Sequence, residues 1–411
     1  MYSDGSASHR WIPGHIIADG LDIPDGVLAL EGDRIAFTGT AAEFAEWEER
    51  EDFERVDVPA GSLLLPGLID LHCHGANGGD FPAGDEAAAR RAVDFLHRSG
   101  TTTLLASLVT ADRAAMLDAA GVLASLAEEG LLAGVHSEGP YVSTVRCGAQ
   151  DPAHISEPEP DFVDELVEAA RGQLRTMTYA PELDGADALV EQLASHGVVP
   201  SLGHTDADAA TTAASLRLAA EELSSAGFDG YTEKPTVTHL FNGMPPLHHR
   251  SPGPVAACLE AAAAGGAVVE LIADGVHLAP DTVRTVFSLL GARNIALVTD
   301  SMSAAGLPDG DYELGPQQVS VRGGEARLGA GGSLAGGTAT MLDVLRSTVA
   351  AGVPLQDAVV SATSVPAAVL GLADEAGSLH QGFSADVLVL DPGLGLLGVY
   401  RQGRRLDPLG D

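Results

Sequence analysis

The sequence is poor in basic residues, and this scarcity narrows the range of possible partners. Lys and Arg together number 22 against 58 Asp and Glu, which gives a formal net charge of -36. Long-range repulsion would oppose an encounter with a nucleic acid or with an anionic membrane surface, so neither is expected as a partner. Lys234 is the only lysine, so a Schiff base or a carboxylated-lysine metal bridge would have to fall on this one residue.

Cysteines and long apolar runs are also scarce. The three cysteines, Cys73, Cys147 and Cys258, lie far apart and form neither a disulfide framework nor a cysteine-zinc pattern. No stretch approaches the ~18 uninterrupted apolar residues of a membrane span, and residues 1–6 show no basic region followed by an apolar run. We therefore expect a cytoplasmic protein.

Apolar runs alternate with Ala-rich helical patterns over most of the chain, which is typical of a (β/α)8 barrel. Shorter β-like runs precede this region, and others follow it around 385–390. We expect an α/β fold in which residues 63–378 form the barrel, while 1–62 and 379–411 join into one small β-sandwich domain. The eight expected barrel strands cover 67–74, 101–107, 132–138, 176–180, 198–204, 235–240, 268–274 and 295–300.

Imidazole and carboxylate side chains gather at the ends of these expected strands. In the first, His72 and His74 are spaced i, i+2 and so point to the same face. Barrel enzymes take their catalytic groups from the carboxyl ends of several strands. A single histidine there is more often structural, but the joint pattern favours a site for Zn²⁺ or Fe²⁺. The further members are His136 and Glu138, His204, His239, Asp274 and His277, and Asp300.

The residue types also indicate a reaction. A divalent ion lowers the pKa of bound water toward ~7 and so supplies a nucleophile at neutral pH. Asp300, at the end of the last expected strand, can take a proton from that water and later return it to a leaving nitrogen. Two structural alternatives stay open: Asp300 as a helix N-cap, and His277 as a residue packed on the following helix.

Several strings resemble the amidohydrolase superfamily and, within it, the N-acetylglucosamine-6-phosphate deacetylases. The histidine pair is shared widely across the superfamily, whereas Glu-Gly-Pro and His-Leu-Phe-Asn-Gly-Met are much more specific to the deacetylases. The resemblance runs from about residue 60 to the tail. Its strings are PGLIDLHCHG at 66–75, HSEGPY at 136–141, GHT at 203–205, THLFNGM at 238–244, IADGVH at 272–277, VTD at 298–300 and GSLHQGFSAD at 377–386.

The resemblance implies hydrolysis of the acetamide of N-acetyl-D-glucosamine 6-phosphate to D-glucosamine 6-phosphate and acetate. It implies Glu138, His204 and His239 as the main metal ligands, with His72 and His74 available for a second ion. One or two ions per subunit are therefore expected, Zn²⁺ first and Fe²⁺ as an alternative. Asp300 is implied as the catalytic acid and base, and a homodimer is implied because the family is often dimeric. The substrate contacts implied are Ala149, Gln150, Asn242, Gly243, Arg250, His277, Leu334, Ala335 and Gly336.

One departure from the family string concerns substrate orientation. Where the family often has Gly-Ala-His, this chain has Gly148-Ala149-Gln150, and Gln150 can form hydrogen bonds but carries no charge. Two other functions stay open as alternatives. One is a different amidohydrolase, such as a dihydroorotase-like enzyme or a deaminase, and the other is a non-catalytic protein that binds sugar phosphates.

Overall fold

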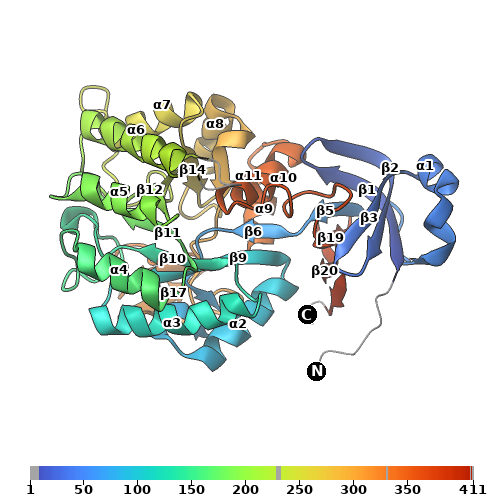
Figure 1. Cartoon of the computed structure of the whole chain (residues 1–411), viewed down its shortest axis with the longest axis horizontal. Helices are drawn as coiled ribbons and strands as arrows, with labels where there is room; N and C mark the ends of the chain where they lie inside the picture. The colour runs from blue at the N-terminus through green and yellow to red at the C-terminus, as the bar shows by residue number, and fades with distance from the viewer. Residues whose placement is uncertain (1–8, 228–232, 330–331, 408, 410–411) are drawn as a thin grey trace.

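The computed structural model describes residues 9–227, 233–329, 332–407 and 409, and shows two large sheets (Figure 1). Position 331 of the glycine-rich segment 331–337 and the N-terminal residues 1–8 lie outside the described part. The larger unit is a nearly closed barrel of parallel strands surrounded by helices. The smaller unit is a sheet made from both ends of the chain, so the expected fold class is confirmed.

The barrel strands follow one another in sequence order. From one edge to the other they are β6 (Leu68–Asp70), β9 (Thr101–Val109), β10 (Gly134–Glu138), β11 (Leu174–Tyr179), β12 (Val199–Leu202), β13 (Thr236–Val237), β14 (Val268–Leu271) and β15 (Ile295–Leu297). All paired strands in this sheet are parallel. A helix lies between each strand and the next, because parallel neighbours need a crossover connection. These strands are buried almost throughout, which explains their continuous apolar runs.

The two edges of the barrel sheet meet just beyond the carboxyl ends of β6 and β15. There the Asp300 N–H donates to the His72 carbonyl at 2.9 Å, and the His74 N–H donates to the Ser301 carbonyl at 2.7 Å. The first and last expected strands are therefore joined at the point where their site residues lie.

Helices cover the outer face of the barrel. They are α2 (Glu86–Arg98), α3 (Arg113–Glu128), α4 (Pro160–Ala169), α5 (Ala186–Ser195), α6 (Ala209–Ala226), α7 (Gly253–Ala263), α8 (Pro280–Leu290), α9 (Met341–Ala350), α10 (Leu355–Ala362) and α11 (Ser364–Val369). Three of them begin at an aspartate whose side chain caps the first turn: Asp85, Asp112 and Asp208. Within the described residues, none of the helices is long and apolar enough to cross a membrane.

The terminal sheet joins the two ends of the chain through β5 (Leu63–Pro66). This strand pairs in parallel with β1 (Arg10–Ala18) and antiparallel with β19 (Val387–Leu390). The sheet buries an apolar cluster of its own, which includes Ile12, Leu28, Leu64 and Val387. The other strands of the terminal sheet are β2 (Leu21–Glu31), β3 (Arg34–Thr40), β4 (Glu54–Arg55), β20 (Leu396–Arg401) and β21 (Arg404–Leu406), with α1 (Ala41–Glu46) beside them.

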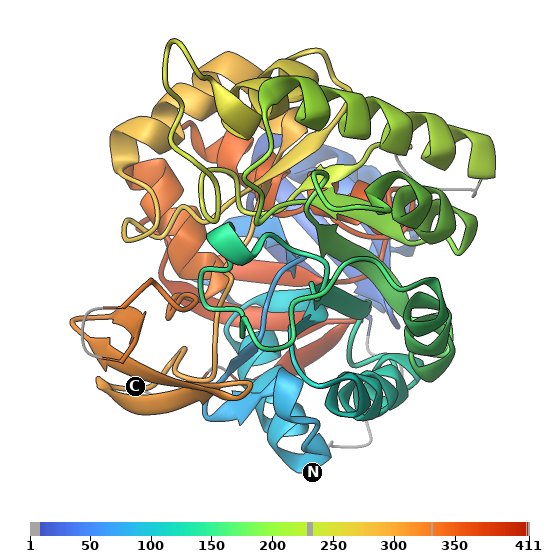
Figure 2. The same ribbon diagram turned by 90° about the vertical axis from the view of Figure 1, so that its left-hand side faces the viewer.

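A third sheet lies between β15 and α9 and had no counterpart among the expected elements. It consists of β16 (Gly310–Leu314), β17 (Gln317–Arg322) and β18 (Glu325–Leu328), drawn in orange to one side in Figure 2. Leu314, Val319, Val321 and Ala326 pack with Val109 of β9, so this sheet rests on the barrel near the carboxyl ends of its strands. A small pair, β7 (Gly75–Ala76) and β8 (Gly79–Asp80), follows β6.

Candidate metal centre and active site

Six imidazole and carboxylate side chains converge at the carboxyl end of the barrel. Glu138 is the last residue of β10, and the other five follow their strands by two to four residues. All six are nearly buried, with exposed fractions between 0% and 8%. Their donor atoms form two groups of three, Glu138–His204–His239 and His72–His74–Asp300.

The first group is arranged around one oxygen of Glu138. Oε1 lies 2.9 Å from His204 Nε2 and 2.9 Å from His239 Nε2, and the two Nε2 atoms are 3.1 Å apart. The other ring nitrogen of His204, Nδ1, donates to the Arg146 carbonyl at 2.7 Å. This fixes the ring so that Nε2 faces Glu138. His239 Nδ1 is buried and has no hydrogen-bond partner among the described residues.

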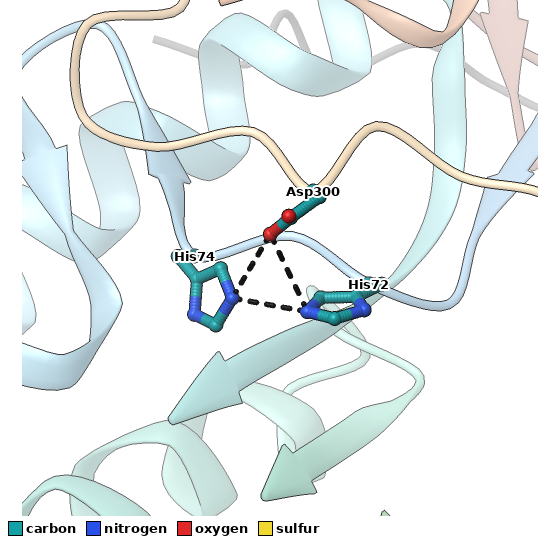
Figure 3. A group of neighbouring side chains, drawn as sticks. All are labelled: His72, His74 and Asp300. Atoms are coloured by element: carbon teal, nitrogen blue, oxygen red, sulfur yellow. Dashed lines mark hydrogen bonds and ion pairs between the residues drawn. The ribbon is translucent and has the colours of Figure 1, made fainter. Parts of the chain in front are cut away.

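The second group is shown in Figure 3. His72 Nε2 and His74 Nε2 are 3.0 Å apart, and Asp300 Oδ1 lies 3.4 Å from the former and 3.2 Å from the latter. His74 Nδ1 faces the Ser107 carbonyl at 3.3 Å. The i, i+2 pair therefore shares one face, as its spacing predicts, and Asp300 comes from the opposite edge of the sheet to join it.

Glu138 connects the two groups, because its other carboxylate oxygen, Oε2, faces the His72–His74–Asp300 group. Oε2 lies 3.2 Å from His74 Nε2, while Oε1 belongs to the first group. For a tetrahedral ion with bonds of about 2.0–2.1 Å, two ligand atoms lie about 3.3 Å apart. The observed separations of 2.9–3.4 Å within the groups are close to this value. The nitrogen and carboxylate donors present thus fit a divalent cation in each group.

The electrostatics of the cluster point the same way. Burial disfavours a charged imidazole, yet hydrogen bonds with Asp300 and Glu138 raise the pKa of His74 to about 9. Burial also disfavours the charged rings of His72 and His204, but the nearby Glu138 and Asp300 carboxylates outweigh it and raise the pKa of both. Burial opposes ionisation of Asp300, but His72 and His74 lower its pKa to about 2. The two buried carboxylates, Glu138 and Asp300, are thus stabilised by positive charge, which protons on the histidines or metal ions can supply.

Three of the six residues have a backbone conformation that side chains rarely adopt. His204, His239 and Asp300 have φ values of 46°, 27° and 47°. Such residues cost free energy and persist where the surrounding structure holds them, most often at functional sites. At Gly243, also at positive φ, an added Cβ would come within 2.8 Å of the His204 ring, so the close approach of this loop requires glycine.

A cavity of about 250 Å³ opens above the two groups. It brings together most of the expected substrate contacts, namely Ala149, Gln150, Asn242, Gly243, His277, Leu334 and Gly336. Gly148, Leu314 and Ser333 also line it, so the unexpected sheet contributes one wall through Leu314. Among the described residues that line the cavity, none is a lysine or an arginine.

Two expected contacts lie elsewhere. Ala335 is fully buried beside the cavity wall, where its N–H donates to the Ala326 carbonyl of β18. Arg250 is exposed in the loop after β13, and its Nη1 donates to His249 Nε2 at 2.9 Å. The structure therefore does not bring Arg250 into the cavity of its own chain.

His277 is held at the cavity by Asp274 of the same loop. Asp274 Oδ2 accepts from His277 Nδ1 at 2.8 Å, and its Oδ1 accepts from the backbone N–H groups of Val276 and His277. Despite burial, the Asp274 carboxylate raises the pKa of His277. The ring is therefore fixed by a residue of its own loop after β14 and is available to a ligand in the cavity.

His136 has a different position from the other strand-end histidines. Its Nδ1 and Nε2 each lie 2.9 Å from a hydroxyl, that of Ser107 and that of Thr178, inside the barrel. It belongs to neither candidate metal group. With both ring nitrogens engaged and burial lowering its pKa, His136 has the features of a structural histidine beneath the site.

Two contacts around the metal groups were not expected from the sequence. Gln150 Nε2 donates to Glu138 Oε2 at 2.6 Å, while its Oε1 accepts from the Thr110 N–H at 2.7 Å. Glu270 Oε2 lies 3.2 Å from His72 Nδ1. A lone carboxylate within the apolar run 268–272 is a signal that could have drawn attention to Glu270.

This chain is similar to known proteins in both sequence and structure. The model of the amidohydrolase family matches residues 63–406. An N-acetylglucosamine-6-phosphate deacetylase of Bacillus subtilis is 34% identical over 384 residues, covering 91% of each chain. An N-acetylgalactosamine-6-phosphate deacetylase of Escherichia coli O157:H7 is 34% identical over 347 residues, covering 83% of this chain and 87% of the relative. The crystal structure of an N-acetyl-D-glucosamine-6-phosphate deacetylase from Mycobacterium smegmatis superposes with a TM-score of 0.86 at 37% identity, covering 97% of this chain and 100% of the other.

Proposed function

Because this chain belongs to the amidohydrolase family, we propose that it hydrolyses the acetamide of N-acetyl-D-glucosamine 6-phosphate. The products are D-glucosamine 6-phosphate and acetate. The observation that carries this proposal is the pair of three-residue groups joined by Glu138 at the base of one cavity. Deacetylases among the relatives agree with this reaction class. A dihydroorotase-like enzyme, a deaminase or a non-catalytic binding protein has no comparable support.

The metal would be held first by Glu138, His204 and His239, and a second ion by His72, His74 and Asp300 with the other oxygen of Glu138. The donors are imidazole nitrogen and carboxylate oxygen without thiolate, a set that suits Zn²⁺ and also Fe²⁺. When bound, such an ion acts as a Lewis acid and brings the pKa of coordinated water toward ~7.

Asp300 moves the proton in this proposal. Its carboxylate is ionised at neutral pH, since its pKa is about 2. It accepts a proton from the water whose oxygen forms a bond to the acetamide carbon. It then returns the proton to the sugar nitrogen as the carbon–nitrogen bond breaks. His277, held through Nδ1 by Asp274, can donate a hydrogen bond to the carbonyl oxygen as negative charge develops there.

The sugar and its phosphate would lie across the cavity. Ala149, Gln150, Leu334 and Gly336 line the cavity beside the sugar in this proposal, and Asn242 and Gly243 also line it. We assign the binding of phosphate oxygens to Asn242 and the Gly243 N–H. A phosphate in so acidic a protein needs a local cation, and we assign this role to Arg250, whose guanidinium fork suits phosphate. Since Arg250 lies outside the cavity of its own chain, either its loop moves or it enters the site of a second copy in a homodimer.

We further infer a cytoplasmic enzyme whose partner is this small molecule, with neither nucleic acid nor membrane involved. The net charge of -36 supports this inference, because it disfavours polyanionic partners.

Acetate release from a panel of sugars tests the substrate. The panel is N-acetylglucosamine 6-phosphate, its unphosphorylated form, and N-acetylgalactosamine 6-phosphate, the substrate named for one relative. We expect fast release from the phosphorylated glucosamine derivative and little from the unphosphorylated sugar. Faster release from the galactosamine derivative would correct the sugar, and no release from any of the three by metal-loaded protein would refute the proposal.

A further inference from the structure

Glu270 is a buried carboxylate on a strand whose other residues are apolar. It lies on β14, is 3% exposed, and has Val268, Val269, Leu271 and Ile272 as buried neighbours in sequence. A buried carboxylate costs free energy unless donors satisfy it. A charge at this place therefore calls for partners inside the barrel.

The Glu270 side chain contacts one residue of each candidate metal group. Oε2 lies 3.2 Å from His72 Nδ1, and the same oxygen accepts from the backbone N–H of His239 at 3.2 Å. His72 is a member of one group and His239 of the other. Glu270 thus touches both groups from the side of the barrel interior, away from the cavity that it does not line.

The contact with His72 determines which ring nitrogen faces the cations. A neutral imidazole carries one N–H, and a carboxylate at Nδ1 keeps the proton there. Nε2 then presents its lone pair toward His74 Nε2 and Asp300 Oδ1, 3.0 Å and 3.4 Å away. Without the acceptor at Nδ1, the proton could move to Nε2. The Nε2–H group would then donate to Asp300 and occupy the space that an ion would take.

We propose that Glu270 is a positioning residue that keeps the His72 proton on Nδ1 and thereby builds His72–His74–Asp300 as a second cation site. This rests on the proposed function in so far as the first cation site is Glu138–His204–His239. The contact of Glu270 with the first group runs through the His239 backbone. The backbone at 239–240 is also held by the Leu240 N–H, which donates to the Glu270 carbonyl at 2.9 Å. Loss of the side chain should therefore weaken the second ion much more than the first.

Two variants separate the acceptor from the charge. E270M keeps the approximate volume but removes the acceptor, so the second ion should bind about 10–100-fold more weakly, the usual effect of losing such a partner. E270Q keeps an oxygen for both donors and loses only the charge. The second ion should then weaken on the order of fivefold, because a neutral acceptor forms a weaker hydrogen bond.

The experiment is a calorimetric titration of metal-free protein with Zn²⁺, with the ion content checked by mass spectrometry after dialysis. We expect two ions in the wild type, the graded loss of the second in E270Q and E270M, and an unchanged first ion in both. Asp386→Asn is the control. This half-buried carboxylate directly before β19 accepts from the Ser384 hydroxyl and the Gln402 N–H, and its loss should leave both ions unchanged.

The outcomes are distinguishable from one another. Wild-type affinity for the second ion in both Glu270 variants would overturn the proposal, and so would an equal loss of both ions. If E270M does not fold, as circular dichroism would show, the fivefold effect in E270Q decides. A wild type that takes one ion yet releases acetate would overturn the role of Glu270 alone. A wild type that takes two ions and releases no acetate would refute the proposed function alone.

Discussion

Replacing Asp300 by Asn tests the proton transfer that we assign to this residue. The side chains have nearly the same shape, and the Asp300 N–H bond to the His72 carbonyl is a backbone contact that the change leaves in place. The amide cannot accept a proton from water or return one to the leaving nitrogen. Loss of a general acid and base typically lowers turnover by ~10²–10⁴, or roughly 3–5 kcal/mol of barrier.

The structure also predicts how this loss depends on pH. Although burial opposes ionisation, His72 and His74 hold the pKa of Asp300 at about 2, so its carboxylate is ionised throughout the neutral range. The ratio of wild-type to variant turnover should therefore stay constant between about pH 6 and pH 8. A ratio that changes tenfold over this interval would mean that another group moves the proton.

The assay is acetate release at saturating substrate, accompanied by ion content and a thermal melt. We expect a folded D300N protein that keeps an ion on Glu138, His204 and His239. Asp300 is also a potential ligand of the second group, so Asp300→Glu, which keeps the charge, serves as the matched variant. Near-normal turnover of D300N would refute the assignment, as would a loss of turnover that D300E shares in full with both ions bound.

Three further predictions concern the surroundings of the site. Arg250→Ala should raise KM far more than it lowers kcat, whereas Arg293→Ala, which removes a surface ion pair with Asp19, should change neither; an unchanged KM would move phosphate recognition elsewhere. Gln150→Leu should lower kcat/KM about 10–100-fold, because Glu138 Oε2 loses a donor and the Thr110 N–H loses its acceptor, and wild-type kinetics would contradict this. Burial raises the pKa of Asp80 to about 7, so its contribution to stability is present below about pH 4 and is lost as pH rises through 7. Urea unfolding should show Asp80→Asn gaining up to ~4 kcal/mol over wild type between pH 4 and pH 8, and equal pH slopes would refute this.

The barrel was predictable because its signals are local. Each strand is a short buried run, and α2, α3 and α6 begin at capping aspartates. The convergence of His72, His74, Glu138, His204, His239 and Asp300 followed from one rule, that parallel strands of a barrel end at the same face. The short, half-exposed strands β16–β18, joined by glycine turns, have no such run and escaped prediction.

Contacts between distant residues could not be predicted in the same way. Glu270 and His72 are 198 positions apart, and their contact depends on which face of β14 meets the barrel interior. The expected position of Gln150 at the cavity agrees with the structure, but its bond to Glu138 depends on the path of the loop after β10. His136 illustrates the opposite case. It sits two residues before Glu138 on the same strand, yet Ser107 and Thr178 engage both of its ring nitrogens.

The most direct test of the central claim is restoration of activity by metal. Protein stripped by a chelator is returned to Zn²⁺ in steps, and acetate release from N-acetylglucosamine 6-phosphate is measured against the number of ions bound. We predict no release from the stripped wild type, recovery as ions bind, and no recovery in His239→Gln, which lacks a ligand of the first group. Full-rate release by protein that holds no measurable ion, or by the metal-treated His239→Gln variant, would contradict a metal-dependent deacetylase.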